Sequence, residues 1–82
     1  MKELISLSAL RPGEAGHVEE MRSAGPMRRR LRDLGLIEGA AVRCLGRSPG
    51  GDPAAYEICG AVLALRDADS GQILVRREGG AP

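Results

Sequence analysis

Residues 27–39 read MRRRLRDLGLIEG, and this stretch decides how the rest of the chain is interpreted. Apolar residues recur in it at the spacing of one helical face: Met27, Leu31 and Leu34. Gly25-Pro26 stands just before them, and proline suits the start of a helix because an N–H there would have no partner. Gly35 stands just after them, where helices commonly end in a left-handed residue. The pattern predicts one amphipathic helix over about residues 26–34, with its apolar face buried.

The opposite face of this predicted helix is basic. Its arginines are Arg28, Arg29, Arg30 and Arg32. Arginines in a first helical turn oppose the helix dipole, and like charges four residues apart repel, each at a cost of about a few tenths of a kcal/mol. A solvated face also carries charge, but clustering against local preference is typical of a surface kept for a partner. We expect Arg29 and Arg32 to contact that partner, and Arg30 to fold back and pair with an acid such as Asp52.

The composition indicates one small globular domain. The chain has 82 residues, of which 43% are hydrophobic and 28% are charged, and Tyr56 is its single aromatic residue. We expect an aliphatic core in a domain over residues 1–77, with a disordered tail over residues 78–82. The net charge of +1 excludes a global field that would attract nucleic acid or a membrane surface.

The sequence also predicts the cellular compartment. No segment has the continuous apolar length of a membrane span, and the start MKELISLSAL lacks the features of a signal peptide. Cys44 and Cys59 form no CxxC pair, which argues against both a disulfide framework and a zinc module. These features predict a cytoplasmic protein with reduced thiols and no direct membrane insertion.

Alternating apolar and polar residues indicate five short strands. Their expected ranges are about 16–21, 41–47, 55–59, 61–66 and 72–76. Tight turns separate them, of which SPGGDP (residues 48–53) is the densest. Five strands with one helix inserted after the first favour a mainly β fold, a small and strongly curved β-barrel. Gly46 and Gly60 are the expected bends or bulges.

The same alternation predicts which side chains point inward. The expected core residues are Leu31, Leu34, Val42, Ile58, Leu63, Leu65 and Val75. Cys44 should be buried and Cys59 accessible, while Arg43 and Arg47 should share the outer face of their strand. One thiol inside and one outside cannot easily share an ion, so we expect no metal site at these cysteines or at His17.

Other chemistry has little support in the sequence. His17 has no nearby serine or cysteine to activate, and Glu19, Glu20 and Glu57 fit the solvent face of a sheet. SPGGDP lacks the lysine and the following helix of a phosphate-binding loop. GEAGHV (residues 13–18) has the pattern of KOW-type RNA-binding barrels, but the chain lacks a basic, aromatic surface for stacking bases. We expect no catalytic residue, no cofactor and no nucleic acid.

Several segments together resemble the FeoA family, small accessory proteins of bacterial ferrous-iron transport. The helix segment is similar in Arg29, Arg30, Leu31, Leu34, Gly35, Leu36 and Gly39. The second half is similar in Gly51-Asp52-Pro53, in GAVLALR (residues 60–66), and in Ile73 and Val75. The likeness is collinear over about residues 4–76, with Glu38 where the family often has proline.

The resemblance implies an SH3-like barrel and a non-enzymatic, cytoplasmic role that supports the membrane transporter FeoB by protein–protein interaction, with self-association as a further possibility. It implies structural roles for Leu31, Leu34, Gly35, Gly39, Asp52, Pro53, Gly60 and Arg66. The alternatives are a metal-binding regulator or iron chaperone, and a KOW-type RNA-binding barrel. The same barrel occurs in iron-dependent repressors of the DtxR type, but we expect no DNA binding because their winged helix has no counterpart in this sequence.

Overall fold

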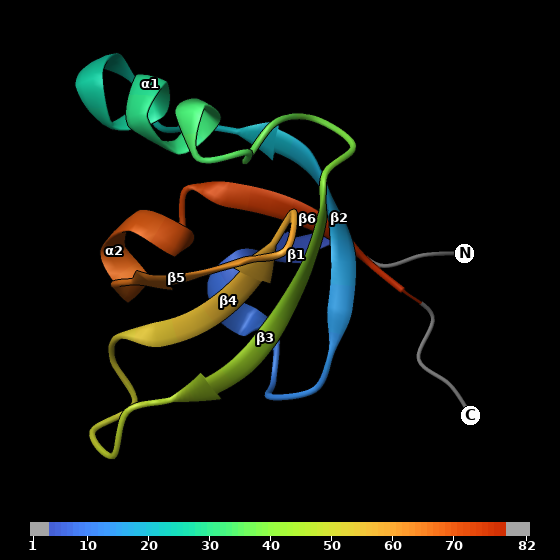
Figure 1. Ribbon diagram of the computed structural model, residues 1–82, viewed down its shortest axis with the longest axis vertical. Helices are drawn as coiled ribbons and strands as arrows, with labels where there is room; N and C mark the ends of the chain where they lie inside the picture. Colours follow the sequence, from blue (N-terminus) through green and yellow to red (C-terminus); the bar gives the residue numbers. More distant parts are fainter. Residues whose placement is uncertain (1–3, 79–82) are drawn as a thin grey trace.

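The computed structural model describes residues 4–78 (Figure 1). In chain order its elements are β1 (Leu4–Ser6), the 3-10 helix η1 (Leu7–Ala9), β2 (Ala15–Met21), α1 (Gly25–Asp33), β3 (Ala41–Arg47), β4 (Ala54–Ile58), β5 (Ala61–Leu65), α2 (Asp67–Ser70) and β6 (Ile73–Arg77). The predicted count of five strands is wrong, because β1 has three residues and runs directly into η1, too short for alternation to develop. The helix therefore follows the second strand. No helix in the described range is long and apolar enough to cross a membrane.

All six strands form one antiparallel sheet in the order β1-β6-β2-β3-β4-β5. Figure 1 shows the sheet curling around the interior, with α1 at one end of the molecule. Within residues 4–78 no ladder joins β5 to β1, so these two strands are free edges. The mainly β fold is confirmed, but the closed barrel predicted from the sequence is replaced by a curled, open sheet.

The core is aliphatic apart from one tyrosine. Its buried side chains are Leu7, Leu10, Val18, Leu31, Leu36, Val42, Cys44, Ala54, Tyr56, Ile58, Leu65, Ile73 and Val75. This confirms the predicted burial of Leu31, which is the buried residue of α1, and of the predicted strand residues except Leu63. Leu63 is half-buried and packs against the core.

The predicted burial of Leu34 is wrong, since 41% of it is exposed. The helix ends just before Leu34, and Gly35 follows with a φ of +103°. The Leu36 N–H donates to the Leu31 carbonyl at 2.9 Å and the Gly35 N–H to the Arg32 carbonyl at 3.0 Å, which is the pattern of a Schellman C-cap. This cap turns the chain so that Leu36, fully buried, joins Leu31 in the core instead of Leu34.

A β-bulge changes the alternation in β3. The register against β4 shifts between Cys44 and Gly46, which confirms the bend predicted at Gly46. Leu45 is 45% exposed, and only 25% of the Arg47 side chain is exposed. Arg43 precedes the bulge and lies on the outer face as predicted, but Arg47 follows it and is turned inward, so its predicted outer position is wrong.

The β4–β5 connection is a two-residue turn of Cys59 and Gly60. Their φ angles are 52° and 82°, and type I′ hairpin turns require positive values at both positions. Cys59 therefore lies in the turn, one residue beyond β4, and Gly60 is a turn residue rather than a bulge. The Cys59 side chain is exposed and that of Cys44 is buried, as predicted.

The C-terminal strand continues its pairing one residue beyond β6. The Glu78 N–H donates to the Ala15 carbonyl at 2.9 Å. Glu78, the first residue of the tail predicted over residues 78–82, is thus hydrogen-bonded to β2. Residues 79–82 lie outside the described range.

Candidate partner-binding surface on helix α1

All four arginines of α1 are exposed and unpaired. They are Arg28, Arg29, Arg30 and Arg32. Within residues 4–78 none of their guanidinium groups makes a hydrogen bond or an ion pair. Most arginines outside the helix are engaged, namely Arg22, Arg43, Arg47, Arg76 and Arg77. Unpaired positive charge is therefore concentrated on this one helix.

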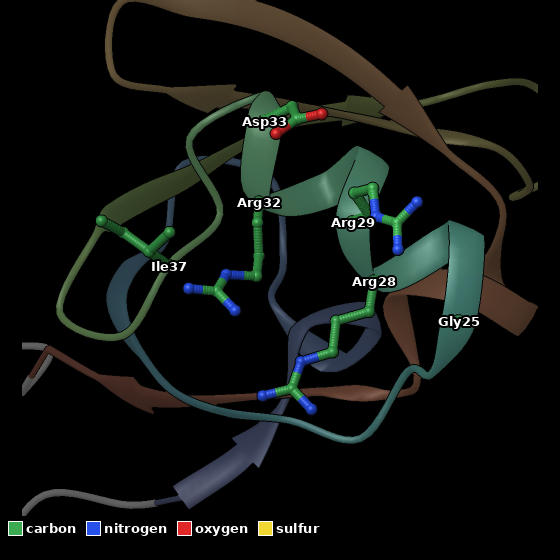
Figure 2. Close-up of a pocket in the computed structure, with 6 residues that line it drawn as sticks. All are labelled: Gly25, Arg28, Arg29, Arg32, Asp33 and Ile37. Atoms are coloured by element: carbon green, nitrogen blue, oxygen red, sulfur yellow. The ribbon is translucent and has the colours of Figure 1, made fainter.

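Three of these arginines surround one open hollow of about 690 Å³, hereafter the outer hollow. Its lining residues are Gly25, Arg28, Arg29, Arg32, Asp33 and Ile37. Figure 2 shows Arg28 and Arg32 extending from the helix in a similar direction, while Arg29 extends differently. Asp33 is the one acid in the lining, so the hollow has an excess of positive charge. Ile37, which is 49% exposed, adds an apolar side chain to this lining.

A second hollow of about 430 Å³ shares two arginines and Ile37 with the outer hollow, and three further acids line it. These acids are Glu19, Glu20 and Glu38. Glu19 accepts a hydrogen bond from Arg76 at 2.8 Å, and Glu20 accepts one from Arg22 at 3.1 Å. The hydrogen bond from Arg76 lowers the pKa of Glu19 and keeps this carboxylate charged. Two of the three acids are thus paired with arginines outside α1. The arginines of α1 therefore remain available to bind a partner.

Arg30 lies on a different side of the helix. It lines a smaller hollow of about 170 Å³ between α1 and β5, together with Arg66 and Asp69. The predicted pairing of Arg30 with Asp52 is wrong, because the Asp52 carboxylate accepts the N–H of Asp67 at 3.0 Å. Asp67 begins α2, and the first N–H groups of a helix have no partner within it. Asp52 therefore has a structural role at the start of α2.

The charged residue that sequence reasoning missed is Arg47. Its guanidinium donates to the carbonyls of Ser8, Leu10 and Gly51 and lies 3.3 Å from the carboxylate of Asp67. These partners belong to η1 and the turn after it, the loop of residues 48–53, and α2. Arg47 therefore ties three segments together, and the bulge at Gly46 is the signal in the sequence that could have placed it there.

Tyr56 is fully buried close to Arg47. Its hydroxyl donates to the Leu7 carbonyl at 3.4 Å, and burial raises the pKa of Tyr56. A KOW-type barrel would need exposed aromatic rings on which bases stack. The single aromatic ring of the chain lies in the core, so it offers no such platform.

The candidate metal ligands are not brought together. Cys44 is buried in β3, Cys59 is exposed in the β4–β5 turn, and His17 lies 3.5 Å from Glu78. In the part of the chain that the structure describes, no group of three or more His, Cys, Asp or Glu residues could hold a metal ion. The alternative of a metal-binding regulator therefore has no donor set among these residues.

The remaining motif residues form turns and caps. Those with positive φ are Gly35, Gly39 and Gly60. Pro53 follows Asp52 through a cis peptide bond. Arg66 is exposed, and its carbonyl accepts the N–H groups of Asp69 and Ser70 in α2. Their contacts are local to these turns and to the start of α2, and none of these residues lines the outer hollow.

Comparison with known proteins identifies the family. The family model described as the FeoA domain matches residues 5–77. No curated protein matches the chain at a significant level. The family match covers nearly all of the described residues, including α1 and every strand except the first residue of β1.

Solved structures share the fold. The solution structure of FeoA from Chlorobium tepidum has a TM-score of 0.88 at 33% identity and covers 95% of this chain and 74% of its own. FeoA from Stenotrophomonas maltophilia, a prokaryotic SH3 domain protein complexed with zinc, has a TM-score of 0.78 at 29% identity over 87% and 88%. A manganese-dependent transcriptional repressor has a TM-score of 0.82 at 25% identity, over 95% of this chain and 38% of its own. The likeness to the repressor thus concerns one part of a longer protein, whereas these two FeoA structures match over most of their length. The chain belongs to the FeoA family, which is associated with ferrous iron transport.

Proposed function

We propose that this protein is a non-enzymatic, cytoplasmic accessory protein of bacterial ferrous-iron uptake, and that it binds the transporter FeoB through the outer hollow of α1. The observation that carries the proposal is the set of three guanidinium groups around that hollow, those of Arg28, Arg29 and Arg32, which make no hydrogen bond or ion pair within residues 4–78. The family's association with ferrous iron transport directs the proposal to the transporter. The complementary surface of FeoB would present carboxylates.

Arginine suits this role because its planar guanidinium binds a carboxylate through two parallel hydrogen bonds. In the free protein, water hydrates these exposed guanidinium groups, so leaving them without a protein partner costs little free energy. On docking, the carboxylates of a partner would form charge-assisted hydrogen bonds with them. Such complementarity contributes mainly to specificity and to the rate of association. Ile37 gives the same surface an apolar contact, which charge alone would not supply.

The direct test is co-purification of this chain with the cytoplasmic GTPase domain of FeoB in defined nucleotide states. The variant reverses two charges, Arg29→Glu and Arg32→Glu. We expect it to lose binding and to fail to restore Fe²⁺ uptake in cells that lack the wild-type protein. Binding of the wild type should weaken as salt rises, because exposed charge pairs are screened over about 10 Å at 0.1 M salt.

A matched control reverses Arg11 and Arg43 to Glu, so the net charge changes by the same amount. Both residues are exposed, and both lie outside the hollows at α1. Arg43 makes one hydrogen bond, to the Gly13 carbonyl at 3.1 Å, so its loss should change stability little. The control should bind FeoB as wild type does. The proposal fails if the Arg29/Arg32 variant still binds FeoB and supports uptake, or if the control loses both to the same degree.

A further inference from the structure

The two free edges of the sheet differ in how they are protected. Natural edge strands are usually short, or carry lysine, proline or a bulge that prevents another strand from adding to them. β1 is three residues long. β5 has five residues, reads AVLAL, contains none of these devices, and pairs in an unbroken register with β4. Val62 at this edge is 67% exposed. β5 is therefore an edge open to strand addition.

The register of the hairpin shows which backbone groups are free. Ile58 and Ala61 flank the two-residue turn and form its closing pair, which in such hairpins is hydrogen-bonded. Hydrogen-bonded and non-hydrogen-bonded pairs alternate along an antiparallel ladder. Leu63 therefore bonds to β4, while Val62 and Ala64 direct their N–H and C=O groups away from it. Within residues 4–78 no backbone hydrogen bond reaches these outward groups.

A groove runs beside this edge. The hollow of about 170 Å³ is lined by three consecutive residues of β5, Leu63, Ala64 and Leu65. Successive side chains of a strand point to opposite faces, so a hollow that touches all three lies along the edge of the strand. Its other wall consists of Met27, Arg30 and Leu31 of α1 and of Leu34, which follows the helix. A strand that adds to β5 is an extended chain, and this hollow lies where side chains of that strand would be placed.

The charge of this groove indicates the occupant. Arg30 and Arg66 line it and are exposed, and within the described range neither guanidinium group makes a hydrogen bond or an ion pair. Asp69 is the only acid among the lining residues. We propose that the free edge of β5 binds an extended segment of a partner protein, which adds to the sheet as a seventh strand and places carboxylates on Arg30 and Arg66. Main-chain hydrogen bonds to Val62 and Ala64 supply affinity, and the two arginines select acidic sequences.

This site is separate from the outer hollow. The outer hollow and the β5 groove share no lining residue. The proposal of strand addition at β5 can therefore be wrong while the proposal of FeoB binding through Arg29 and Arg32 is right, and the converse also applies. Each experiment thus tests its own surface.

The test uses a capped peptide in which valine and glutamate alternate, and a control peptide with lysine in place of glutamate. NMR hydrogen exchange on the full chain reports each amide separately. The glutamate peptide should slow exchange at Val62 and Ala64 by at least about tenfold, because their free N–H groups become hydrogen-bonded. The lysine peptide should not. Equal protection by both peptides, or no protection by either, would overturn the proposal.

A proline at the edge removes the donor without removing an internal bond. Ala64→Pro should abolish protection at Val62, since proline is tolerated where the strand N–H faces solvent. Ala64→Glu is a second variant that keeps the backbone unchanged and repels an acidic strand added beside it. Ala64→Thr retains the N–H and the strand preference, so it should bind the peptide as wild type does. Retained binding of the glutamate peptide by both Ala64→Pro and Ala64→Glu would contradict strand addition.

The charge selection is tested by Arg30→Ala with Arg66→Ala. This double variant should bind the glutamate peptide no better than the lysine peptide. A second copy of the chain is the competing occupant. If Val62 and Ala64 become protected with rising protein concentration in the absence of peptide, the edge pairs with itself and the proposal of an acidic partner is overturned.

Discussion

Arg47 and the arginines of α1 have the same side chain but lie in opposite environments. Arg47 is largely buried, donates to three carbonyls and pairs with a carboxylate. Arg28, Arg29 and Arg32 are exposed and, within residues 4–78, make no polar contact with the protein. Arg47 therefore holds the fold together, whereas those on α1 leave their hydrogen-bonding groups to solvent or a partner. This difference in contacts separates an arginine with a structural role from those that we propose bind a partner.

The two regions also differ in how they are anchored. The Arg47 region connects η1, the loop of residues 48–53 and α2 through polar contacts over a buried tyrosine. α1 is anchored mainly by Leu31 and by the Leu36 cap that follows it. The proposed recognition surface thus lies on a helix with a small apolar anchor, and most of the polar cross-links lie elsewhere.

Each region has one thiol, and labelling should give the largest difference between them. Cys44 is fully buried in β3 near Arg47, and Cys59 is exposed beside Gly35, which follows α1. A buried thiol in a core strand reacts only when the domain opens, and global opening of a small domain is about 5–15 kcal/mol uphill. Cys59 should therefore react at least about a thousandfold faster than Cys44 under native conditions, measured by mass spectrometry after timed alkylation. Comparable rates would show that the Arg47 region opens locally.

Truncation of single leucine side chains should show which of them anchors α1 to the core. Leu31→Ala should lower the free energy of unfolding by about 2–4 kcal/mol, because Leu31 is fully buried in the core. Leu34→Ala is the matched control, and it should lose less than about 1 kcal/mol because Leu34 is exposed after the helix end. Urea denaturation of both variants measures the difference. Equal losses would mean that Leu34, not Leu36, packs against the core.

Arg47 should contribute more to stability than any exposed arginine. Arg47→Met keeps most of the aliphatic stem but removes every donor, which leaves the carbonyls of Ser8 and Leu10 without this partner. We expect a loss of about 1.5–3 kcal/mol, the range for hydrogen bonds to charged groups. Arg43→Met is the control, since Arg43 is exposed with one bond to a carbonyl, and it should lose less than about 0.5 kcal/mol. A loss in Arg47→Met as small as in the control would show that Arg47 contributes no more to stability than an exposed arginine.

The elements with a strong local signal were predictable from the sequence. The helix was placed one residue too late at each end, and β3 was predicted with its observed bounds of 41–47. The identity and exposure of the basic residues on α1 also followed from helical spacing. These features depend on periodicity within one segment, which a single sequence contains.

The errors come from contacts between segments and from backbone irregularities. Leu34 was assigned to the core because helical spacing was extended past Gly35, although the Schellman cap places Leu36 there. Arg47 was placed outside because alternation was continued through the bulge. Asp52 was paired with Arg30, whereas the fold brings its carboxylate to the first N–H of α2. The grouping of three arginines around one hollow, with Arg30 apart, likewise depends on tertiary structure.

The smallest expected effect is a gain in stability, from substitution of Arg28. It contrasts directly with the loss of stability expected for Arg47→Met. Arg28 lies in the first turn of α1, which has no acidic residue, and it stands four residues before Arg32. Arg28→Glu replaces an unfavourable charge at the positive end of the helix dipole and turns a repulsive pair into an attractive one. We expect unfolding to require about 0.3–1 kcal/mol more free energy at low salt, as measured by thermal and urea denaturation. Arg28→Gln should give roughly half of this gain, and 1 M salt should remove most of it because the charges are exposed. A loss of stability in Arg28→Glu would show that Arg28 makes a structural contact, and the division between structural and recognition arginines would then fail at this residue.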